Sequence, residues 1–246
     1  MAADHFSTVA TDYASHRPTY PAALFDWLSA QCEGHSLAWD CGAGSGQAST
    51  ALAAHFERVL ATDMSEQQLS HAPAHPRIEY RVAPAESSGL PDRSTDLVTV
   101  AQALHWFALE RFYDEVRRVL KPGGLIAAWT YGLITVDGDE ANTQLQHFYH
   151  HIIGPYWPAE RCHVETGYRE LPFHFQRIQT PELAMQTDWT LEQLAGYLRS
   201  WSASARYAQA NGKDAVAELV TQLRAGWGDP STARTVRWPL AILAGR

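Results

Sequence analysis

The stretch Leu37-Ala-Trp-Asp-Cys-Gly-Ala-Gly-Ser-Gly46 points to the fold of this 246-residue chain more directly than any other. A short apolar run ends in Asp40, and glycines follow at alternate positions. Residues 47–56 then have the composition of a helix. Strand, glycine turn and helix, in this order, open a nucleotide-binding α/β fold. The glycines let backbone come close to a ligand, and the helix N-terminus offers unpaired N–H groups.

Strand and helix patterns alternate on both sides of this unit. Each predicted strand is an apolar or alternating run, and each predicted helix has apolar residues at helical spacing. Beyond the opening unit, the predicted strands are 58–63, 78–83, 96–101 and 125–130, and the predicted helices are 21–28, 64–69 and 109–120. This alternation indicates a Rossmann-like α/β fold with a doubly wound, mostly parallel sheet, for which we expect seven strands.

Periodicity is weaker after Tyr131. Helices are predicted at 140–153, 191–207 and 213–227, and strands at 173–178 and 235–243. Pro239 would restrict the last strand to an edge or a bulge, because proline has no N–H to donate. These elements indicate a helical cap inserted before the last strands.

Composition excludes several classes of protein. The apolar fraction of 46% suits a globular core, and the net charge of −8 without a basic block argues against a nucleic-acid partner. No stretch approaches the roughly 20 apolar residues of a membrane span, and the N-terminus has no signal pattern. The cysteines Cys32, Cys41 and Cys162 lie far apart, which argues against a disulfide framework or structural zinc and favours the cytoplasm.

Two ligands compete for the glycine turn. A dinucleotide fold expects G-x-G-x-x-G, but Gln47 stands where the third glycine belongs. Asp40, two residues before the first glycine, is an awkward neighbour for a pyrophosphate and suits a cationic ligand. S-adenosylmethionine carries an ammonium and a sulfonium and has no phosphate, so the pattern D-x-G-x-G-x-G favours it. A plain tight turn remains the alternative.

Acidic residues after the next two strands fit the rest of such a ligand. Asp63 lies 19 residues beyond Gly44, near the spacing at which a carboxylate meets ribose hydroxyls, and a helix N-cap is its other possible role. Met64 would lie on an adenine face or fill the core. Glu86 would accept from an adenine amino group or stand as an exposed loop carboxylate.

These residues together resemble the class I S-adenosylmethionine-dependent methyltransferases of the type 11-like group. The resemblance rests on Asp40–Gly46, Asp63, Ala85-Glu86 and Lys121-Pro-Gly-Gly124, within residues 37–130. A narrower resemblance, to the small-molecule branch with trans-aconitate methyltransferases, rests on Tyr13-Ala-Ser-His-Arg-Pro-Thr-Tyr-Pro21, Ala101-Gln-Ala-Leu-His-Trp-Phe107 and Tyr197-Leu-Arg-Ser-Trp-Ser-Ala203.

The resemblance implies a cofactor site for S-adenosylmethionine, with S-adenosylhomocysteine as the product. The methionine part of the cofactor would contact the glycine turn and Gln102. The ribose would contact Asp63, and the adenine would contact the loops after the second and third strands. The implied residues are Asp40, Gly42, Ala43, Gly44, Asp63, Met64, Ala85, Glu86 and Gln102. The whole chain, 1–246, would be one domain with an N-terminal cap segment (1–34), a cofactor-binding core (35–131), a substrate cap with late strands (132–234) and a last strand (235–246).

The acceptor side rests on fewer signals. His105 follows the fourth strand and would act as a base, as a hydrogen-bond donor to substrate or as a packing residue beside Trp106. An anionic acceptor would need arginine, for which Arg17 and Arg199 lead over Arg161 and Arg206 because they lie in the resembling segments. Aromatic residues of the later half would line an acceptor pocket or pack the core.

No metal site is expected. His147 and His151 stand four residues apart on a predicted helix, but no third ligand is evident.

The leading hypothesis is therefore methyl transfer from S-adenosylmethionine to a small-molecule acceptor, with a trans-aconitate-like carboxylate as one candidate. A quinone or other C-methyltransferase is the first alternative. A non-catalytic S-adenosylmethionine-binding protein is the second, and a dinucleotide oxidoreductase is disfavoured by Gln47 and Asp40.

Overall fold

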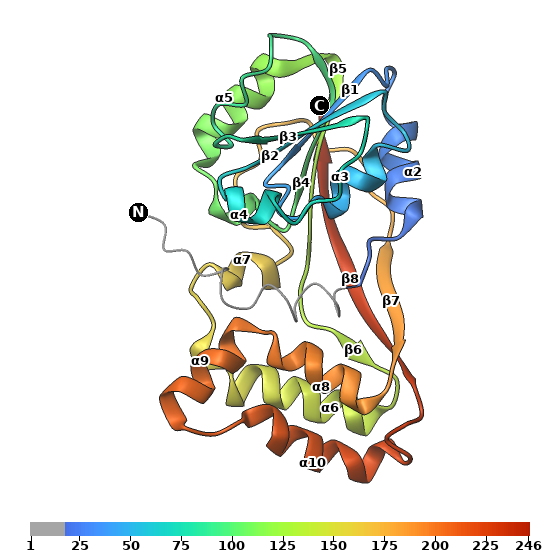
Figure 1. Ribbon diagram of the computed structural model, residues 1–246, viewed down its shortest axis with the longest axis vertical. Coiled ribbons are helices and arrows are strands. Elements are labelled where there is room, and N and C mark those ends of the chain that lie inside the picture. The colour runs from blue at the N-terminus through green and yellow to red at the C-terminus, as the bar shows by residue number, and fades with distance from the viewer. Residues whose placement is uncertain (1–17) are drawn as a thin grey trace. The chain divides into compact units, whose positions relative to one another are not determined.

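The computed structural model describes residues 18–246, which form two compact units (Figure 1). The sheet unit consists of Tyr20–Gly132, Cys162–Leu183 and Leu240–Arg246. The helical unit consists mainly of Leu133–Arg161 and Ala184–Pro239. The assignment of the whole chain to a single domain stays a prediction.

The strands follow the order β3-β2-β1-β4-β5-β8-β6, and β7 also pairs with β8. Strands β1 to β5 run parallel, and β8 is antiparallel to β5. Their bounds are β1 Leu37–Cys41, β2 Arg58–Asp63, β3 Ile78–Val82, β4 Thr95–Ala101, β5 Leu120–Tyr131, β6 Thr135–Val136, β7 Leu183–Trp189 and β8 Arg234–Gly245. The expected doubly wound, mostly parallel fold is confirmed, with eight strands where seven were expected.

Burial explains why the first five strands form. Six of the seven residues of β4 are buried, as a central parallel strand requires when helices cover both faces of a sheet. The helices of this unit are α2 Ala22–Ala30, α3 Gln47–Leu52, α4 Glu66–Leu69, α5 Leu109–Val119 and α7 Arg161–Glu165, the last beginning at the unit boundary. Figure 1 shows α5 on one side of the sheet and α2 and α3 on the other.

Helix α5 packs with the predicted face. Phe112, Val116 and Val119 are completely buried, and the Phe112 ring lies 6.1 Å from the Trp39 ring of β1. The Trp39 indole donates to Thr62 Oγ1 at 2.8 Å, so the large side chain at the centre of β1 is also satisfied as a donor. These contacts fix β1 and β2, whose ends carry the glycine turn and Asp63.

The later half departs from the sequence expectations. Residues 173–178 form no strand beyond an isolated bridge between Arg177 and Gly245, and β7 forms further on. The predicted helix 191–207 is two helices, α8 Leu191–Arg199 and α9 Ser202–Asn211. Between them Trp201 adopts an extended backbone as the residue before α9.

Two further helices complete the helical unit. Helix α6 spans Asp139–His147 and continues as a π-helical turn, Phe148–Ile152, so the expected helix over 140–153 is confirmed. Helix α10 spans Ala215–Trp227. In β8, Pro239 lies between residues that pair with β6 and residues that pair with β5, so its missing N–H falls where the partner changes.

The late aromatic residues form much of the core of the helical unit. Trp189, Tyr197, Trp201 and Trp238 are all buried, and the Trp238 indole donates to Tyr197 Oη at 2.9 Å. The rings of Trp189 and Trp238 meet edge to face at 5.0 Å. These four side chains therefore pack the core, which is one of the two roles that the sequence left open for the late aromatic residues.

Candidate functional site

The glycine turn begins at the carboxyl end of β1 and is held against β2. The N–H groups of Gly42 and Ala43 both donate to Thr62 O, at 2.8 and 2.9 Å. The next N–H, of Gly44, donates to Asp63 Oδ2 at 2.8 Å. Three consecutive main-chain donors thus attach the turn to the end of the neighbouring strand.

Two of the glycines differ in what surrounds them. Gly42 (φ 71°) has no room for a side chain, because an added Cβ would lie 2.6 Å from Ala103 Cβ. At Gly44 (φ 55°), an added Cβ would meet, among residues 18–246, only Gln68 Oε1, at 4.0 Å. The backbone at Gly44 therefore borders open space, as a turn that receives a ligand requires.

Asp40, the last residue but one of β1, has a carboxylate with no exposed surface. Its oxygens accept from Ser49 Oγ of α3 at 2.5 Å and from Thr99 Oγ1 of β4 at 2.9 Å. Burial raises the pKa of Asp40 to about 6, and the nearby Asp63 charge raises it further, against the two hydroxyl hydrogen bonds. Asp40 thus joins β1 to α3 and β4, and its place among the cofactor-binding residues stays a prediction.

Asp63 closes β2 and belongs to the turn rather than to the cap of α4. Oδ2 accepts from Gly44 N, and Oδ1 accepts from Ser65 N at 2.9 Å. The N-cap of α4 is Ser65, whose side chain accepts from Gln68 N. Another residue therefore fills the N-cap role that the sequence left open for Asp63. The Asp63 carboxylate is partly buried beside Gly44.

Met64 follows immediately and is 69% exposed, so it does not fill the core. Ala85 is buried in the loop after β3. The neighbouring Glu86 is half-buried, accepts from Ala108 N at 3.0 Å and lines an open cavity of about 470 Å³. An exposed apolar side chain and a carboxylate thus flank the carboxyl edge of β2 and β3.

Gln102 directly follows β4 and is one of the non-glycine residues with positive φ, at 61°. Its amide accepts from Thr130 Oγ1 at 2.8 Å and donates to Tyr131 O at 3.2 Å. Such a conformation costs about 1 kcal/mol or more and is found where surrounding contacts impose it, often at ligand sites. The side chain is directed along β5, while the turn at Gln102 lets the chain enter the loop that carries His105.

His105 and Trp106 lie in a short 3-10 helix, Leu104–Trp106, after β4. The Trp106 side chain is 47% exposed, and the two rings lie 4.7 Å apart. His105 Nδ1 lies 3.0 Å from Tyr168 Oη, and Tyr168 is completely buried with a φ of 62°. A buried phenol thus contacts Nδ1 of the histidine that the sequence proposed for the acceptor side.

Tyr168 is the residue of this edge that sequence reasoning missed. It lies in a turn after α7, in a stretch without helical or strand periodicity. No motif surrounds it, and only the tertiary fold places it against the loop after β4. The positive φ, unusual for a bulky side chain, is a signal that only the structure provides.

Each predicted arginine that the structure describes has a partner within the helical unit. Arg17 lies outside the described residues. Arg199 belongs to the helical unit, and its Nε donates to Asp214 Oδ2 at 3.0 Å. Arg161 stacks over Trp157 at 4.6 Å and donates to Tyr149 Oη, and Arg206 donates to Tyr156 O at 3.4 Å.

Acidic side chains gather at the carboxyl edge of β1 to β4. Asp40 is the last residue but one of β1, Asp63 ends β2, and Glu86 lies in the loop after β3. No lysine or arginine stands in the connecting residues 42–46, 64–65, 83–87 and 102–108. Arg111 and Arg118 of α5 line the cavity beside Glu86, so basic side chains approach this edge from the helix and not from the loops. Acidic side chains in the loops favour a cationic nucleoside over a phosphate.

The cysteines are free thiols. Cys41, inside the glycine motif, is buried, and burial raises the pKa of its thiol well above the usual value. It is therefore a small core residue, as expected. Within residues 18–246, no group of three or more His, Cys, Asp or Glu side chains is placed to hold a metal ion. Over the same residues, every helix is too short or too polar to cross a membrane.

Comparison with known proteins agrees with this geometry. A family model described as a methyltransferase domain matches residues 39–128. A Dictyostelium discoideum protein named as a methyltransferase is 36% identical over 88% of this chain and 83% of its own length. A methyltransferase-like protein of Schizosaccharomyces pombe is 30% identical over 80% of this chain and 77% of its own length.

A solved structure supports the same assignment. The structure, described as a type II methyltransferase from Anaeromyxobacter dehalogenans, superposes with a TM-score of 0.90 at 48% identity, covering 94% of this chain and 97% of the other. The chain therefore belongs to the class I S-adenosylmethionine-dependent methyltransferases. It is a methyltransferase whose fold implies that cofactor.

Proposed function

We propose that the carboxyl edge of β1 to β4 binds S-adenosylmethionine and that the protein transfers its methyl group to a small-molecule acceptor. The observation that carries this proposal is the hydrogen bond between the glycine turn and Asp63, with open space at Gly44 among the described residues and no lysine or arginine in the four connecting loops. When bound, S-adenosylmethionine supplies an electrophilic methyl group on a sulfonium. The chain's own task is then alignment and exclusion of water.

Each residue of the site has a proposed role. Asp63 would accept from the ribose hydroxyls, because a carboxylate can take two donors at once. Met64 would lie on the adenine face, and Ala85 and Glu86 would flank the adenine edge. The Gly42–Gly44 backbone and the turn at Gln102 would border the methionine part, whose ammonium the buried Asp40 charge would attract without contact.

We further propose a carboxylate-bearing acceptor, such as a trans-aconitate-like acid, on the side of His105 and Trp106. An ionised carboxylate needs no general base, so in this version His105 orients the acceptor by a hydrogen bond from its outer nitrogen. Tyr168 would fix the ring through Nδ1. A cytoplasmic location is part of the proposal, and the free thiols fit a reducing compartment.

Labelled-methyl transfer against a panel of small acids, phenols, amines and quinones tests the acceptor, with mass spectrometry of the product. We expect an ester from an acid and a His105→Ala variant that keeps most of its turnover at saturating acceptor. Methylation only at carbon or nitrogen, together with loss of turnover in His105→Ala, would replace the carboxylate version with a base-assisted one. Cofactor binding without transfer to any acceptor would favour a non-catalytic binding protein.

A further inference from the structure

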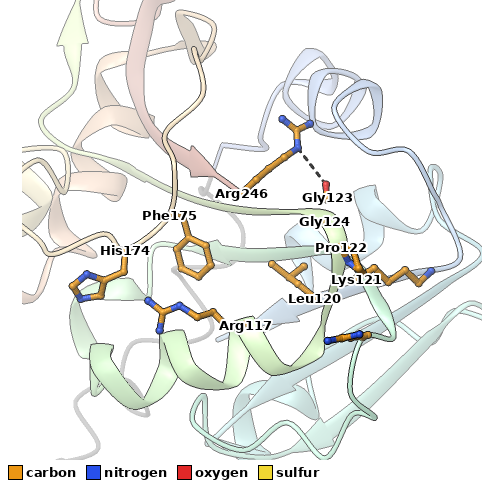
Figure 2. A pocket seen from close by; sticks show the side chains of 10 residues that line it. Arg117, Leu120, Lys121, Pro122, Gly123, Gly124, His174, Phe175 and Arg246 are labelled. Carbon is orange, nitrogen blue, oxygen red and sulfur yellow. Dashed lines mark hydrogen bonds between the residues drawn. The ribbon is translucent and has the colours of Figure 1, made fainter.

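A second cavity of the sheet unit lies at the other end of the strands, where β5 begins (Figure 2). Leu120, the first residue of β5, pairs with Thr95, the first residue of β4, whereas the site described above follows Ala101 at the far end of β4. The cavity has a volume of about 450 Å³, and its lining residues are Arg93, Arg117, Leu120, Lys121, Pro122, Gly123, Gly124, His174, Phe175 and Arg246.

The lining is strongly basic for so acidic a protein. Lysine and arginine make up 19 of the 246 residues, and the net charge is −8. Yet Arg93, Arg117, Lys121 and Arg246 are four of the ten lining residues, His174 is a fifth, and none of the ten is acidic. The basic residues come from four separate segments, so local sequence composition does not explain their meeting.

Two of these cations have no acidic partner. For Arg93, which is exposed, the part of the chain that the structure describes shows no side-chain hydrogen bond or ion pair. Arg246 donates from Nε to Gly123 O at 3.2 Å and from Nη2 to Gln31 O at 2.5 Å, which are neutral acceptors. Figure 2 shows the Arg246 side chain reaching over the Gly123 turn. The positive charge of both guanidinium groups is therefore available to an anion.

Two further lining side chains, Arg117 and His174, have only exposed acidic partners. Arg117 pairs with Asp114 at 3.0 Å, and His174 with Glu110 at 2.9 Å, but these acids are 78% and 75% exposed. Exposed pairs contribute little and exchange partners readily. Lys121 differs, because it donates to the buried Asp96 at 2.7 Å and is committed to the fold.

An apolar wall completes the cavity. The Phe175 ring lies under the Arg117 guanidinium at 5.4 Å, and Leu120 and Pro122 add apolar surface on either side of Lys121. The volume falls within the roughly 300–1,000 Å³ of typical small-molecule sites. Basic groups beside this small apolar wall suit a compact organic anion with several charges.

We propose that this cavity binds a small polyanion with two or more phosphate or carboxylate groups. Its ligand is neither methyl donor nor acceptor, because the cavity lies at the amino edge of the sheet. It is a regulatory or stabilising ligand of the sheet unit, held by Arg93, Arg117 and Arg246 with the help of His174. The proposal does not depend on the identity of the methyl acceptor.

Calorimetric titration of the full-length protein with tripolyphosphate and, separately, with citrate tests this site. We expect saturable one-site binding of at least one of them, and the stronger probe identifies phosphate or carboxylate as the preferred group. Arg93→Gln and Arg246→Gln should each weaken binding about tenfold, the effect of losing one charge-assisted contact. Affinity for S-adenosylhomocysteine should be unchanged in both variants, so failure here is distinguishable from failure of the proposed function.

The matched control is Arg58→Gln, an exposed arginine of β2 that does not line the cavity and pairs only loosely with Glu79 at 3.8 Å. It should bind both probes like the wild type. Absence of saturable binding up to about 10 mM of either probe, or equal weakening by all three variants, would overturn the proposal, since a general surface charge would then explain any binding.

Discussion

Asp40 is the residue of the glycine motif whose charge state the fold changes most clearly. Its carboxylate is fully buried, accepts from hydroxyls of α3 and β4, and has a pKa raised by burial to about 6. In the unfolded chain its pKa would be near 3.9. The folded state therefore favours the neutral acid, and the ionised form that a cationic ligand prefers is present mainly above pH 6.

This difference predicts the pH dependence of stability. Because the folded pKa exceeds the unfolded one, Asp40 lowers the unfolding free energy as pH rises from about 4 to about 6, by roughly 3 kcal/mol in total. Asp40→Asn removes this loss, so its stability relative to the wild type should improve by about that amount between pH 4 and 7. Urea unfolding of both proteins at several pH values measures it, and a constant difference across this range would contradict the assignment.

The contact between Tyr168 and His105 is expected to affect the kinetics of the methyl acceptor. Tyr168→Phe removes the oxygen 3.0 Å from His105 Nδ1 and leaves the ring in place. We expect kcat/KM for the acceptor to fall about three- to tenfold, as for the loss of one hydrogen bond of about 1 kcal/mol, with unchanged affinity for S-adenosylhomocysteine. The effect should disappear in a His105→Ala background.

The control for this prediction is Tyr113→Phe, which removes another hydroxyl of a fully buried tyrosine, one that donates to Pro172 O at 2.8 Å. It should reduce stability and leave kcat/KM near the wild-type value. Equal kinetic losses in Tyr168→Phe and Tyr113→Phe would mean that both residues act only on the fold.

For single residues, the sequence predicts which residue types belong to the site better than it predicts which side chains they contact. The spacing of Asp40, Gly44 and Asp63 was enough to predict that they lie near one another, because each stands at or just beyond the carboxyl end of a parallel strand. The Asp214 partner of Arg199 and the contact of Tyr168 with His105 join positions 15 and 63 residues apart, and no local pattern encodes such contacts.

Among the elements, the glycine turn connects fold and function most closely. Gly44→Ala should cost only about 1 kcal/mol of stability, from its positive φ, and should weaken S-adenosylhomocysteine binding tenfold or more because the new methyl group enters the open space. Gly42→Ala should cost more, about 3 kcal/mol, because its Cβ would overlap with Ala103.

Thermal unfolding and titration of the two variants separate these effects. If Gly44→Ala bound S-adenosylhomocysteine as tightly as the wild type, the proposal that the ligand binds in the space beside Gly44 would be wrong.

Helix α8 offers a test that is independent of the site. Thr190 forms a capping box with Gln193, in which each side chain satisfies a main-chain N–H of the other residue. Thr190→Ala should lower the unfolding free energy by about 1 kcal/mol and leave methyl transfer unchanged. Thr221→Ala, whose hydroxyl donates to Ala217 O within α10, is the control and should change stability by less, about 0.5 kcal/mol at most. Equal losses would contradict the cap as the cause.

The elements up to Tyr131 were predictable because buried parallel strands read as apolar runs and α5 has a clear apolar stripe. The later elements were not. Strand β7 alternates between exposed residues and inward ones such as the buried Met185 and Trp189, but this alternation covers only seven residues between irregular segments and was missed. The break before α9 has no proline or glycine, and it arises where the buried Trp201 takes an extended backbone.

The whole molecule carries a net charge of −8, and its acids and bases are unevenly placed. The carboxyl edge of the parallel strands combines Asp40, Asp63 and Glu86 with no lysine or arginine in the adjoining loops. The cavity at the amino edge has lysine and arginine side chains and no acid in its lining. We therefore propose ligands of opposite charge at the two edges of the sheet, a cationic nucleoside and a small polyanion.

The central claim is that the carboxyl edge binds S-adenosylmethionine, and calorimetric titration with S-adenosylhomocysteine tests it most directly. We predict saturable one-site binding to the wild type, at least tenfold weaker binding to Asp63→Asn, and unchanged binding to Asp26→Asn, an exposed acid of α2. NAD should not bind. No binding of S-adenosylhomocysteine to the wild type, or equal affinity in the wild type and Asp63→Asn, would contradict the account.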